Sequence, residues 1–423
     1  MSPARPSVGE FPTLTAKWLR TRLRRRGGRT RLALITPWPP GQSGVADYSW
    51  RLAPELARHV DLEVVVADRD LRHAPPSAPG VSVVGAGAYR RTRSRRRREQ
   101  ALYCMGNSQA HEHVYELLRT QRGAVLLHDA QLTGFFGWYA GRERPEDPLE
   151  RLVERVERLY GDRVPAEELR TAPLSWRRRV ELGIFMTGEI HQHADRVFVH
   201  SRFAADVVMR DAQLLGRRVP VSVMPFGMPD AAAQAAAAEP VPAPLVVHMG
   251  AVSEIKGIAA LIEGFALLAA SQPGARLAIG GAGAEEADLN RWRSFARERA
   301  PQAQVEILGR LDEDAYASLL RRADLAVQLR MATNGEASGA VADCLAAGVP
   351  TIVTDLGWMG ELPRSAVEHV PLDAPPQLLA ARMRELVNDG ARRAALSRGA
   401  LEHADTRSFA AVAASYLDAL SLL

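Results

Sequence analysis

The feature that most constrains the fold is an alternation of apolar strands and amphipathic helices that runs through the chain twice. The first run begins with an apolar strand at 31–37, a proline- and glycine-containing loop, and a helix at 45–59. The second run has apolar strands at 245–249, 276–279, 305–308, 325–329 and 350–354, with helices at 257–270, 313–321 and 339–347. This strand–helix–strand rhythm is typical of parallel sheets covered by helices. We therefore expect an α/β protein with two domains.

The composition along the chain predicts where these domains begin and end. Residues 231–244 are rich in alanine, proline and glutamate and lack strand signals, so we interpret them as a linker. We expect an N-terminal domain at 31–230, a C-terminal domain at 245–405, and a C-terminal helix at 406–423 that crosses back to the N-terminal domain. Residues 1–30 form a basic N-terminal extension. Two such domains place a ligand-binding cleft between the carboxyl ends of their sheets.

Several protein classes are excluded by what the sequence lacks. It has no run of eighteen apolar residues and no apolar segment that resembles a secretory signal, so we expect a cytoplasmic protein. Its two cysteines, Cys104 and Cys344, cannot form a disulfide scaffold or a cysteine-rich metal site. We expect no metal site.

Two basic segments bear on the partners of the protein. Residues 13–31 mix basic and apolar residues at roughly helical spacing, a pattern that is compatible with peripheral association with an anionic membrane at its inner face. A solvated extension is the alternative. Residues 90–98 hold seven arginines, which predicts an exposed loop that attracts phosphates. Neither segment has interleaved aromatic residues or a nucleic-acid-binding motif, so we expect no nucleic-acid partner.

Lysine is so rare in this chain that its position is informative. Only Lys17 and Lys256 occur among 54 basic residues. Lys256 follows a strand and a loop and opens a helix, so its ammonium can reach a diphosphate at the helix N-terminus. A surface lysine without a ligand is the alternative.

A second candidate site lies in the segment N-G-E-A-S-G-A-V-A-D at 334–343. Ser338 can cap a helix that continues toward Gly348, and a helix N-terminus suits a diphosphate. Glu336 precedes this helix and Asp343 lies inside it, so the two acids could hold hydroxyls of a sugar and a ribose. The alternative is that both acids decorate a surface helix.

Three residues of the first run are candidates for the opposite side of the cleft. Gly41 and Gly44, in the loop after the first strand, permit close approach of the backbone to a phosphate or sugar, and a plain turn explains them almost as well. His128 ends an apolar strand, where sites of α/β proteins gather. The alternative for His128 is a buried structural histidine.

Several motifs, in this order along nearly the whole chain, resemble one enzyme family. They are P-P-G-Q-S-G-V-A-D-Y at 39–48, Y-C-M-G-N at 103–107, L-H-D at 127–129, H-S-R at 200–202, M-P-F-G at 224–227, the stretch from Met249-Gly250 to Lys256-Gly257, and the paired-acid segment at 334–350. Together they resemble the retaining glycosyltransferases of family 4, within the glycosyl transferases group 1. The resemblance implies the GT-B fold, in which two Rossmann-like domains face an interdomain cleft.

The resemblance also implies roles for the candidate residues. It implies that the N-terminal domain binds the acceptor and the C-terminal domain binds a nucleotide sugar, with a UDP- or GDP-sugar as substrate and no cofactor or metal. The sugar-containing acceptor would be lipid-linked, a polysaccharide or a small metabolite. Catalytic roles fall on Lys256, Glu336 and His128. The implied donor-binding residues are Gly41, Gly44, Gly250, Arg330, Arg310, Ser338, Gly339, Ala340 and Asp343.

The chain departs from the family pattern at two places. Ala251 stands where the family has a phosphate-binding arginine, so we expect Arg330 or Arg310 to supply the missing charge. Glu336 and Asp343 are seven residues apart, whereas the family spacing is eight and ends in glutamate. These departures leave two alternatives: a non-catalytic nucleotide-sugar-binding subunit, and a nucleotide-sugar 2-epimerase of the same fold.

Overall fold

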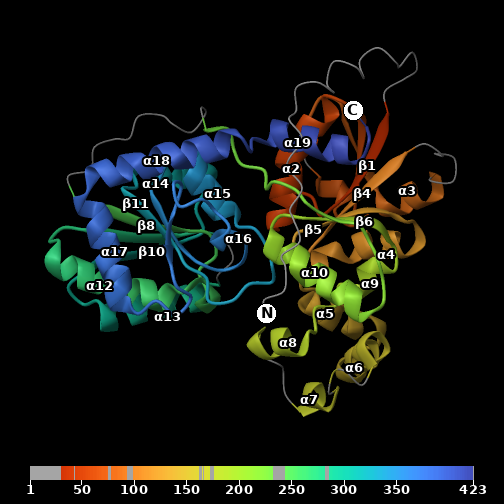
Figure 1. Cartoon of the computed structure of the whole chain (residues 1–423), viewed down its shortest axis with the longest axis horizontal. Coiled ribbons are helices and arrows are strands. Elements are labelled where there is room, and N and C mark those ends of the chain that lie inside the picture. Colours follow the sequence, from red (N-terminus) through yellow and green to blue (C-terminus); the bar gives the residue numbers. More distant parts are fainter. Residues whose placement is uncertain are drawn as a thin grey trace, which may run out of the picture.

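A computed structural model describes most of the chain (Figure 1). The described residues are 30–41, 43–74, 78–92, 99–161, 164, 166–171, 176–231, 243–281 and 285–422. The basic extension expected at 1–30, apart from residue 30, lies outside them, as do residues 232–242 of the expected linker and residues 93–98 of the arginine run. Arg90 and Arg91, expected in a loop, instead lie in a short helix, α3 (Ala86–Thr92).

The N-terminal domain contains a parallel sheet of seven strands within the described residues, in the order β3-β2-β1-β4-β5-β6-β7. The strands are β1 (Arg31–Ile35), β2 (Asp61–Val66), β3 (Val81–Gly85), β4 (Gln100–Met105), β5 (Gly123–Leu127), β6 (Ala194–Val199) and β7 (Val221–Val223). Both faces are buried because successive side chains of β1 alternate between two cores. Leu32 and Leu34 pack into one core, and Ala33 and Ile35 into the other.

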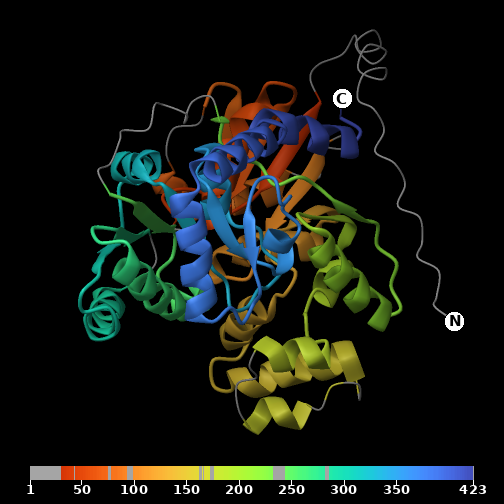
Figure 2. The same ribbon diagram turned by 60° about the vertical axis from the view of Figure 1, so that its left-hand side comes forward.

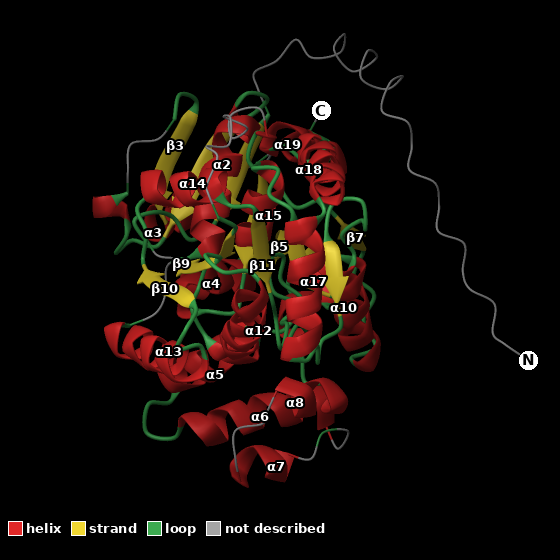
Figure 3. Cartoon of the chain, turned by 90° about the vertical axis from the view of Figure 1, so that its left-hand side faces the viewer, coloured by secondary structure: helices red, strands yellow, loops and turns green. Residues whose placement is uncertain are grey.

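Helices cover both faces of this sheet. They are α2 (Gly44–Ala57), α3, α4 (Glu112–Thr120), α5 (Thr133–Glu143), α6 (Pro148–Tyr160), α7 (Ala166–Thr171), α8 (Trp176–Leu182), α9 (Gly188–His191) and α10 (Arg202–Leu214). In α2, Ser43 caps the first turn, and Tyr48, Leu52 and Leu56 lie buried on one face. Helices α6, α7 and α8 form a separate helical group at one end of the molecule (Figure 3).

Ion pairs with the buried Arg155 fix α6 of this group to the rest of the domain. Its guanidinium pairs with Glu143 at 2.6 Å and with Glu189 at 3.0 Å, and it lies over the ring of Phe136. Tyr115 donates a hydrogen bond to the same Glu189 carboxylate at 2.9 Å. Arg155 and Glu189 are buried together, and Glu143 adds a second carboxylate from nearer the surface, so the buried arginine has the paired charges that it requires.

The C-terminal domain has a second parallel sheet, with six strands among the described residues in the order β10-β9-β8-β11-β12-β13. The strands are β8 (Leu245–Met249), β9 (Arg276–Gly280), β10 (Gln304–Gly309), β11 (Leu325–Gln328), β12 (Thr351–Thr354) and β13 (Glu368–Val370). The helices are α12 (Ile258–Ser271), α13 (Glu286–Arg299), α14 (Glu313–Arg322), α15 (Gly339–Ala346), α16 (Gly357–Gly360), α17 (Pro376–Asn388) and α18 (Gly390–Asp405). Helices α12, α13 and α17 contribute to one core, and α14 and α15 to the other. In each sheet the strand order reverses beside the first strand, and loops at such a point form the ligand sites of open α/β sheets.

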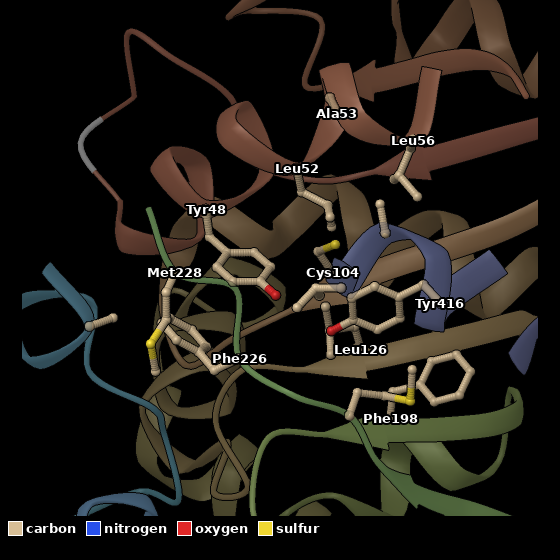
Figure 4. Packing of buried hydrophobic residues seen from close by; sticks show 14 of the residues in the cluster. Tyr48, Leu52, Ala53, Leu56, Cys104, Leu126, Phe198, Phe226, Met228 and Tyr416 are labelled. Carbon is tan, nitrogen blue, oxygen red and sulfur yellow. The ribbon is translucent and has the colours of Figure 1, made fainter. Parts of the chain in front are cut away.

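The last helix, α19 (Phe409–Ala419), leaves the C-terminal domain and packs on α2 of the N-terminal domain (Figures 1 and 2). Tyr416 of α19 lies among Tyr48, Leu126 and Phe198 in the N-terminal core (Figure 4). The backbone carbonyl of Leu420 accepts a hydrogen bond from Gln100 at 2.9 Å. The C-terminal end of the chain is therefore part of the N-terminal domain's core.

The two domains also touch at the carboxyl ends of their sheets. The backbone carbonyl of Asn334 accepts hydrogen bonds from the backbone N–H groups of Ala130 (2.6 Å) and Gln131 (3.0 Å). Glu361 reaches α10 and accepts from the backbone N–H groups of Arg202 (2.9 Å) and Phe203 (2.6 Å). A carboxylate at a helix N-terminus satisfies free N–H groups and interacts favourably with the helix dipole.

Candidate active site

Two cations meet where β8 and β11 end. Lys256 closes a short 3₁₀ turn, Glu254–Lys256, and Arg330 follows β11. The backbone N–H of Met331 donates to the carbonyl of Ile255 at 2.8 Å, which holds the two segments together. Gly257 has φ +64°, and a Cβ there would lie 2.9 Å from Leu329 Cβ, so this approach requires glycine.

The electrostatics of this pair favour an anion. Burial and the positive charge of Arg330 together lower the pKa of Lys256 to about 7. Burial also lowers the pKa of Arg330 to about 10, against the opposing charge of Asp129. Lys256 makes no ion pair with any residue that the structure describes. A diphosphate would supply the negative charge that this lysine lacks.

The N-terminus of α15 lies beside the same loops. Ser338 caps the helix and accepts from the Val341 N–H at 3.4 Å. A Cβ on Gly339 would meet nothing within 4 Å, so the first turn is open to a ligand. Gly250, at φ +101°, approaches Ala340 so closely that a Cβ there would lie 3.2 Å from the Ala340 Cβ. These four residues of the predicted donor site are therefore adjacent, around a helix end that favours anions.

The first acid, Glu336, is held by protein donors. One carboxylate oxygen pairs with Arg330. The other accepts from Thr333 Oγ1 at 2.8 Å and from the backbone N–H of Asn334 at 2.6 Å. Glu336 thus fixes both the buried arginine and the loop that contacts the N-terminal domain.

The second acid, Asp343, lies where α15 faces α2 of the N-terminal domain, away from the loop that holds Glu336. Its Oδ1 accepts from Arg51 Nη1 of α2 at 3.1 Å, and its Oδ2 accepts from the Tyr316 hydroxyl of α14 at 3.1 Å. Arg310 is exposed, and its charge acts on Asp47 of α2. Of the two arginines expected beside Lys256, the structure therefore places Arg330 there.

The N-terminal domain contributes His128 and its neighbours. His128 is buried, its backbone N–H donates to Met105 O at 2.8 Å, and its ring lies 5.1 Å from that of Tyr48 and 5.2 Å from that of His200. Burial, with the nearby His200 and His111, holds the pKa of His128 well below its usual range, so the ring is neutral at pH 7. Gly41 closes a turn on Trp38 O at 3.0 Å, and Gly44 begins α2 with open space at its Cβ position.

Asp129 joins the motifs at 103–107 and 127–129. Its Oδ2 accepts from the backbone N–H of Asn107 at 2.8 Å. Burial raises the pKa of Asp129 to about 6, although the Asn107 N–H and Arg330 oppose this shift. Sequence reasoning included Asp129 in a motif without a role, and it gave none to Arg51, Asp47 or Tyr316. Asp47 belongs to the motif at 39–48, but no local signal marks Arg51 or Tyr316. Arg51 meets Asp343 across the domain interface, and Tyr316 meets it between α14 and α15.

The described residues contain no group of three or more histidine, cysteine, aspartate or glutamate residues placed to hold a metal ion. None of their helices is both long enough and apolar enough to cross a membrane.

Comparisons with known proteins identify the fold. Residues 231–403 match the family model of glycosyl transferases group 1. One similar solved structure is that of Anabaena HepE in complex with UDP, with 14% sequence identity, a TM-score of 0.61, and coverage of 93% of this chain and 100% of that one. Another is sucrose-phosphate synthase from Thermosynechococcus elongatus, with 16% identity, a TM-score of 0.64, and coverage of 93% of this chain and 98% of that one. A glycosyltransferase from Rickettsia africae is also similar, with 11% identity, a TM-score of 0.63, and coverage of 93% of this chain and 98% of that one. No curated protein sequence matches the chain. The chain has the GT-B fold, as the sequence predicted.

Proposed function

We propose that this protein is a retaining glycosyltransferase of the family 4 type that uses a nucleoside-diphosphate sugar as donor. The observation that carries the proposal is the Lys256–Arg330 cation pair beside the N-terminus of α15. This pair lies within the segment that matches the group 1 model and close to Asp129 of the other domain. The buried Arg330, the half-buried Lys256 and a helix N-terminus are together suited to a diphosphate leaving group.

Stabilisation of the leaving diphosphate would be the main catalytic contribution. Negative charge develops on this group as the bond to the sugar breaks, and Lys256 and Arg330 would stabilise it. Loss of one such contact typically lowers the rate about 10²–10³-fold. The binding of UDP by the similar Anabaena protein supports UDP as the nucleotide. GDP is the alternative that the experiment below tests.

In the proposed mechanism, the acceptor hydroxyl attacks the anomeric carbon from the face that the diphosphate leaves, which retains the anomeric configuration. The new C–O bond replaces the bond to the diphosphate, and an oxygen of the leaving diphosphate takes the acceptor's proton. Neutral His128 would orient the sugar, Glu336 would hold its hydroxyls, and Asp343 would hold those of the ribose. Neither a metal nor a further cofactor takes part.

The acceptor in this proposal is a sugar-containing molecule, either lipid-linked, a polysaccharide or a small metabolite. We propose that the enzyme is cytoplasmic and binds peripherally to the anionic inner face of a membrane through its basic segments. Co-sedimentation with phosphatidylglycerol vesicles, but not with phosphatidylcholine vesicles, is the expected result. Equal recovery with both vesicles would contradict the membrane part of the proposal.

Ala251 favours one alternative, a nucleotide-sugar-binding subunit without activity. Arg330 weighs against it, because this arginine supplies a second cation beside Lys256. An epimerase would change the stereochemistry of the donor sugar in the absence of an acceptor. Product analysis without an acceptor therefore separates this alternative from a transferase.

A thermal-shift panel with UDP, GDP, dTDP, ADP and CMP tests the donor site. A nucleotide at 100 times its Kd should stabilise the fold by about 2.7 kcal/mol. We expect one nucleotide to stabilise the wild type and to lose this effect in Lys256→Ala. The corresponding nucleotide sugars are then tested for sugar release or transfer, and a bound nucleotide without either activity would favour the binding subunit.

A further inference from the structure

Both carboxylate oxygens of Asp343 already have protein donors. Arg51 reaches Oδ1 from α2 of the N-terminal domain, and Tyr316 reaches Oδ2 from α14 of the C-terminal domain, each at 3.1 Å. The Arg51 side chain is 45% exposed, whereas that of Asp343 is 15% exposed. A second molecule that binds Asp343 must therefore share or replace at least one of these donors.

The surrounding charges form a cluster from both domains. Asp47 precedes Arg51 by one turn of α2, and Arg310 approaches from the C-terminal domain. Burial raises the pKa of Asp47, and the negative charge of Asp343 also raises it. The positive charges of Arg51 and Arg310 lower it. Each carboxylate of the cluster thus interacts with Arg51. The cluster is distinct from the Lys256–Arg330 pair. Among the described residues, Arg330 is the one charge that shifts the pKa of Lys256, and Arg51, Asp47, Asp343 and Arg310 do not act on it.

We infer that Arg51 competes with the donor's ribose hydroxyls for Asp343, and so sets how strongly the donor site prefers a ribose. This inference rests on the proposed function, in which Asp343 binds the ribose. A ribose brings two vicinal hydroxyl donors, and the exposed guanidinium of Arg51 can return to water when they replace it. Arg51 therefore lowers the affinity for every nucleotide that uses Asp343, and it reduces the advantage of a ribose over a sugar without these hydroxyls.

The size of the effect follows from the exposure of the pair. Ion pairs with one exposed partner contribute little, so their replacement changes an affinity by about two- to fivefold. The loss of a positive charge also weakens the long-range attraction of any diphosphate. A comparison of two nucleotides of equal charge cancels this second contribution.

The experiment measures the Kd of UDP and of 2′,3′-dideoxy-UDP by calorimetry on the full chain. In Arg51→Ala we expect the ratio of the dideoxy-UDP Kd to the UDP Kd to rise about two- to fivefold over the wild-type ratio. Arg51→Lys, which keeps a competing donor, should restore a ratio near that of the wild type. Arg58→Ala is the matched control, since Arg58 is exposed at the end of the same helix and pairs with Glu55 at 2.6 Å.

The outcomes separate the inference from the function on which it rests. An unchanged or lower ratio in Arg51→Ala, with UDP still bound by the wild type, overturns the role of Arg51 alone. A rise of the same size in Arg58→Ala also overturns it, because the effect would then not depend on Asp343. Failure of the wild type to bind any nucleotide of the panel refutes the proposed function, and the inference with it.

Discussion

Replacement of Lys256 by methionine should stabilise the unliganded protein. Lys256 has an ordinary pKa of 10.5 when unfolded and a pKa of about 7 in the folded protein. Because the folded pKa is the lower one, protonation favours the unfolded chain. This cost is present in full below pH 7 and disappears as the pH rises toward 10.5. Methionine has a similar length and no charge, so it removes the cost.

The magnitude follows from the two pKa values. Their difference corresponds to about 5 kcal/mol below pH 7, at about 1.4 kcal/mol for each pH unit. Lys256 retains partial exposure, so we expect a gain of roughly 2–5 kcal/mol. For a domain of this size, that gain raises Tm by about 5–15 °C. The gain should fall by about half by pH 9, because the folded Lys256 is then neutral and the remaining cost is that of deprotonating the side chain from its unfolded pKa of 10.5, at about 1.4 kcal/mol for each pH unit.

Differential scanning fluorimetry at pH 6.5 and pH 9, with and without UDP, measures both effects. Lys256→Met should melt higher than the wild type at pH 6.5, by a smaller margin at pH 9, and should gain nothing from UDP. Arg321→Met, an exposed arginine of the same domain, serves as control and should change the free energy of unfolding by less than about 0.5 kcal/mol. A lower Tm for Lys256→Met, or a margin independent of pH, would refute the electrostatic argument.

Three further substitutions test other parts of the structure. Glu361→Ala removes the carboxylate that caps α10 across the domain interface, so it should lower the free energy of unfolding by about 1 kcal/mol. It should also increase the radius of gyration in X-ray scattering. An unchanged radius would show that other contacts hold the domains together. Gly335→Ala places a Cβ at φ +86° and 2.6 Å from Ala130 Cβ, so it should lower the free energy of unfolding in urea by about 1–3 kcal/mol. An unchanged free energy would contradict the close approach of the two domains at this glycine. Arg155→Met leaves buried Glu189 with less compensation and should cost about 3 kcal/mol in the same assay, whereas a stable variant would show that Arg158 alone neutralises this acid.

Much of the C-terminal fold could be predicted because its strands are short, apolar and bounded by turn residues. Strand β8 begins and ends at the predicted residues, and β9, β11 and β12 differ from the prediction by one residue at an end. In the N-terminal domain, β4 received no prediction as a strand, although it lies beside β1 in the sheet. It follows the arginine run without a turn signal, so its apolar sequence was interpreted only as part of a motif.

The candidate site was predictable only as far as its residues lie in local motifs. Ser338 caps α15 and Lys256 lies just before the N-cap of α12, and both positions depend on neighbours in sequence. The pairing of Arg51 with Asp343 joins residues 292 positions apart in different domains. Helical spacing marks Arg51 only as a residue on an exposed face of α2, so no pattern in the chain indicates its partner.

The return of α19 to the N-terminal domain makes that domain discontinuous in sequence. Residues 243–405 can be regarded as a domain inserted into it, because the outgoing and returning segments lie side by side, with the Met228 N–H donating to the Arg407 carbonyl at 2.8 Å. A fragment that stops near residue 230 lacks Tyr416 and the rest of α19, and so exposes the face of α2 that they cover. An excision that instead joins residue 228 to residue 408 through a short turn keeps the whole N-terminal core in one polypeptide.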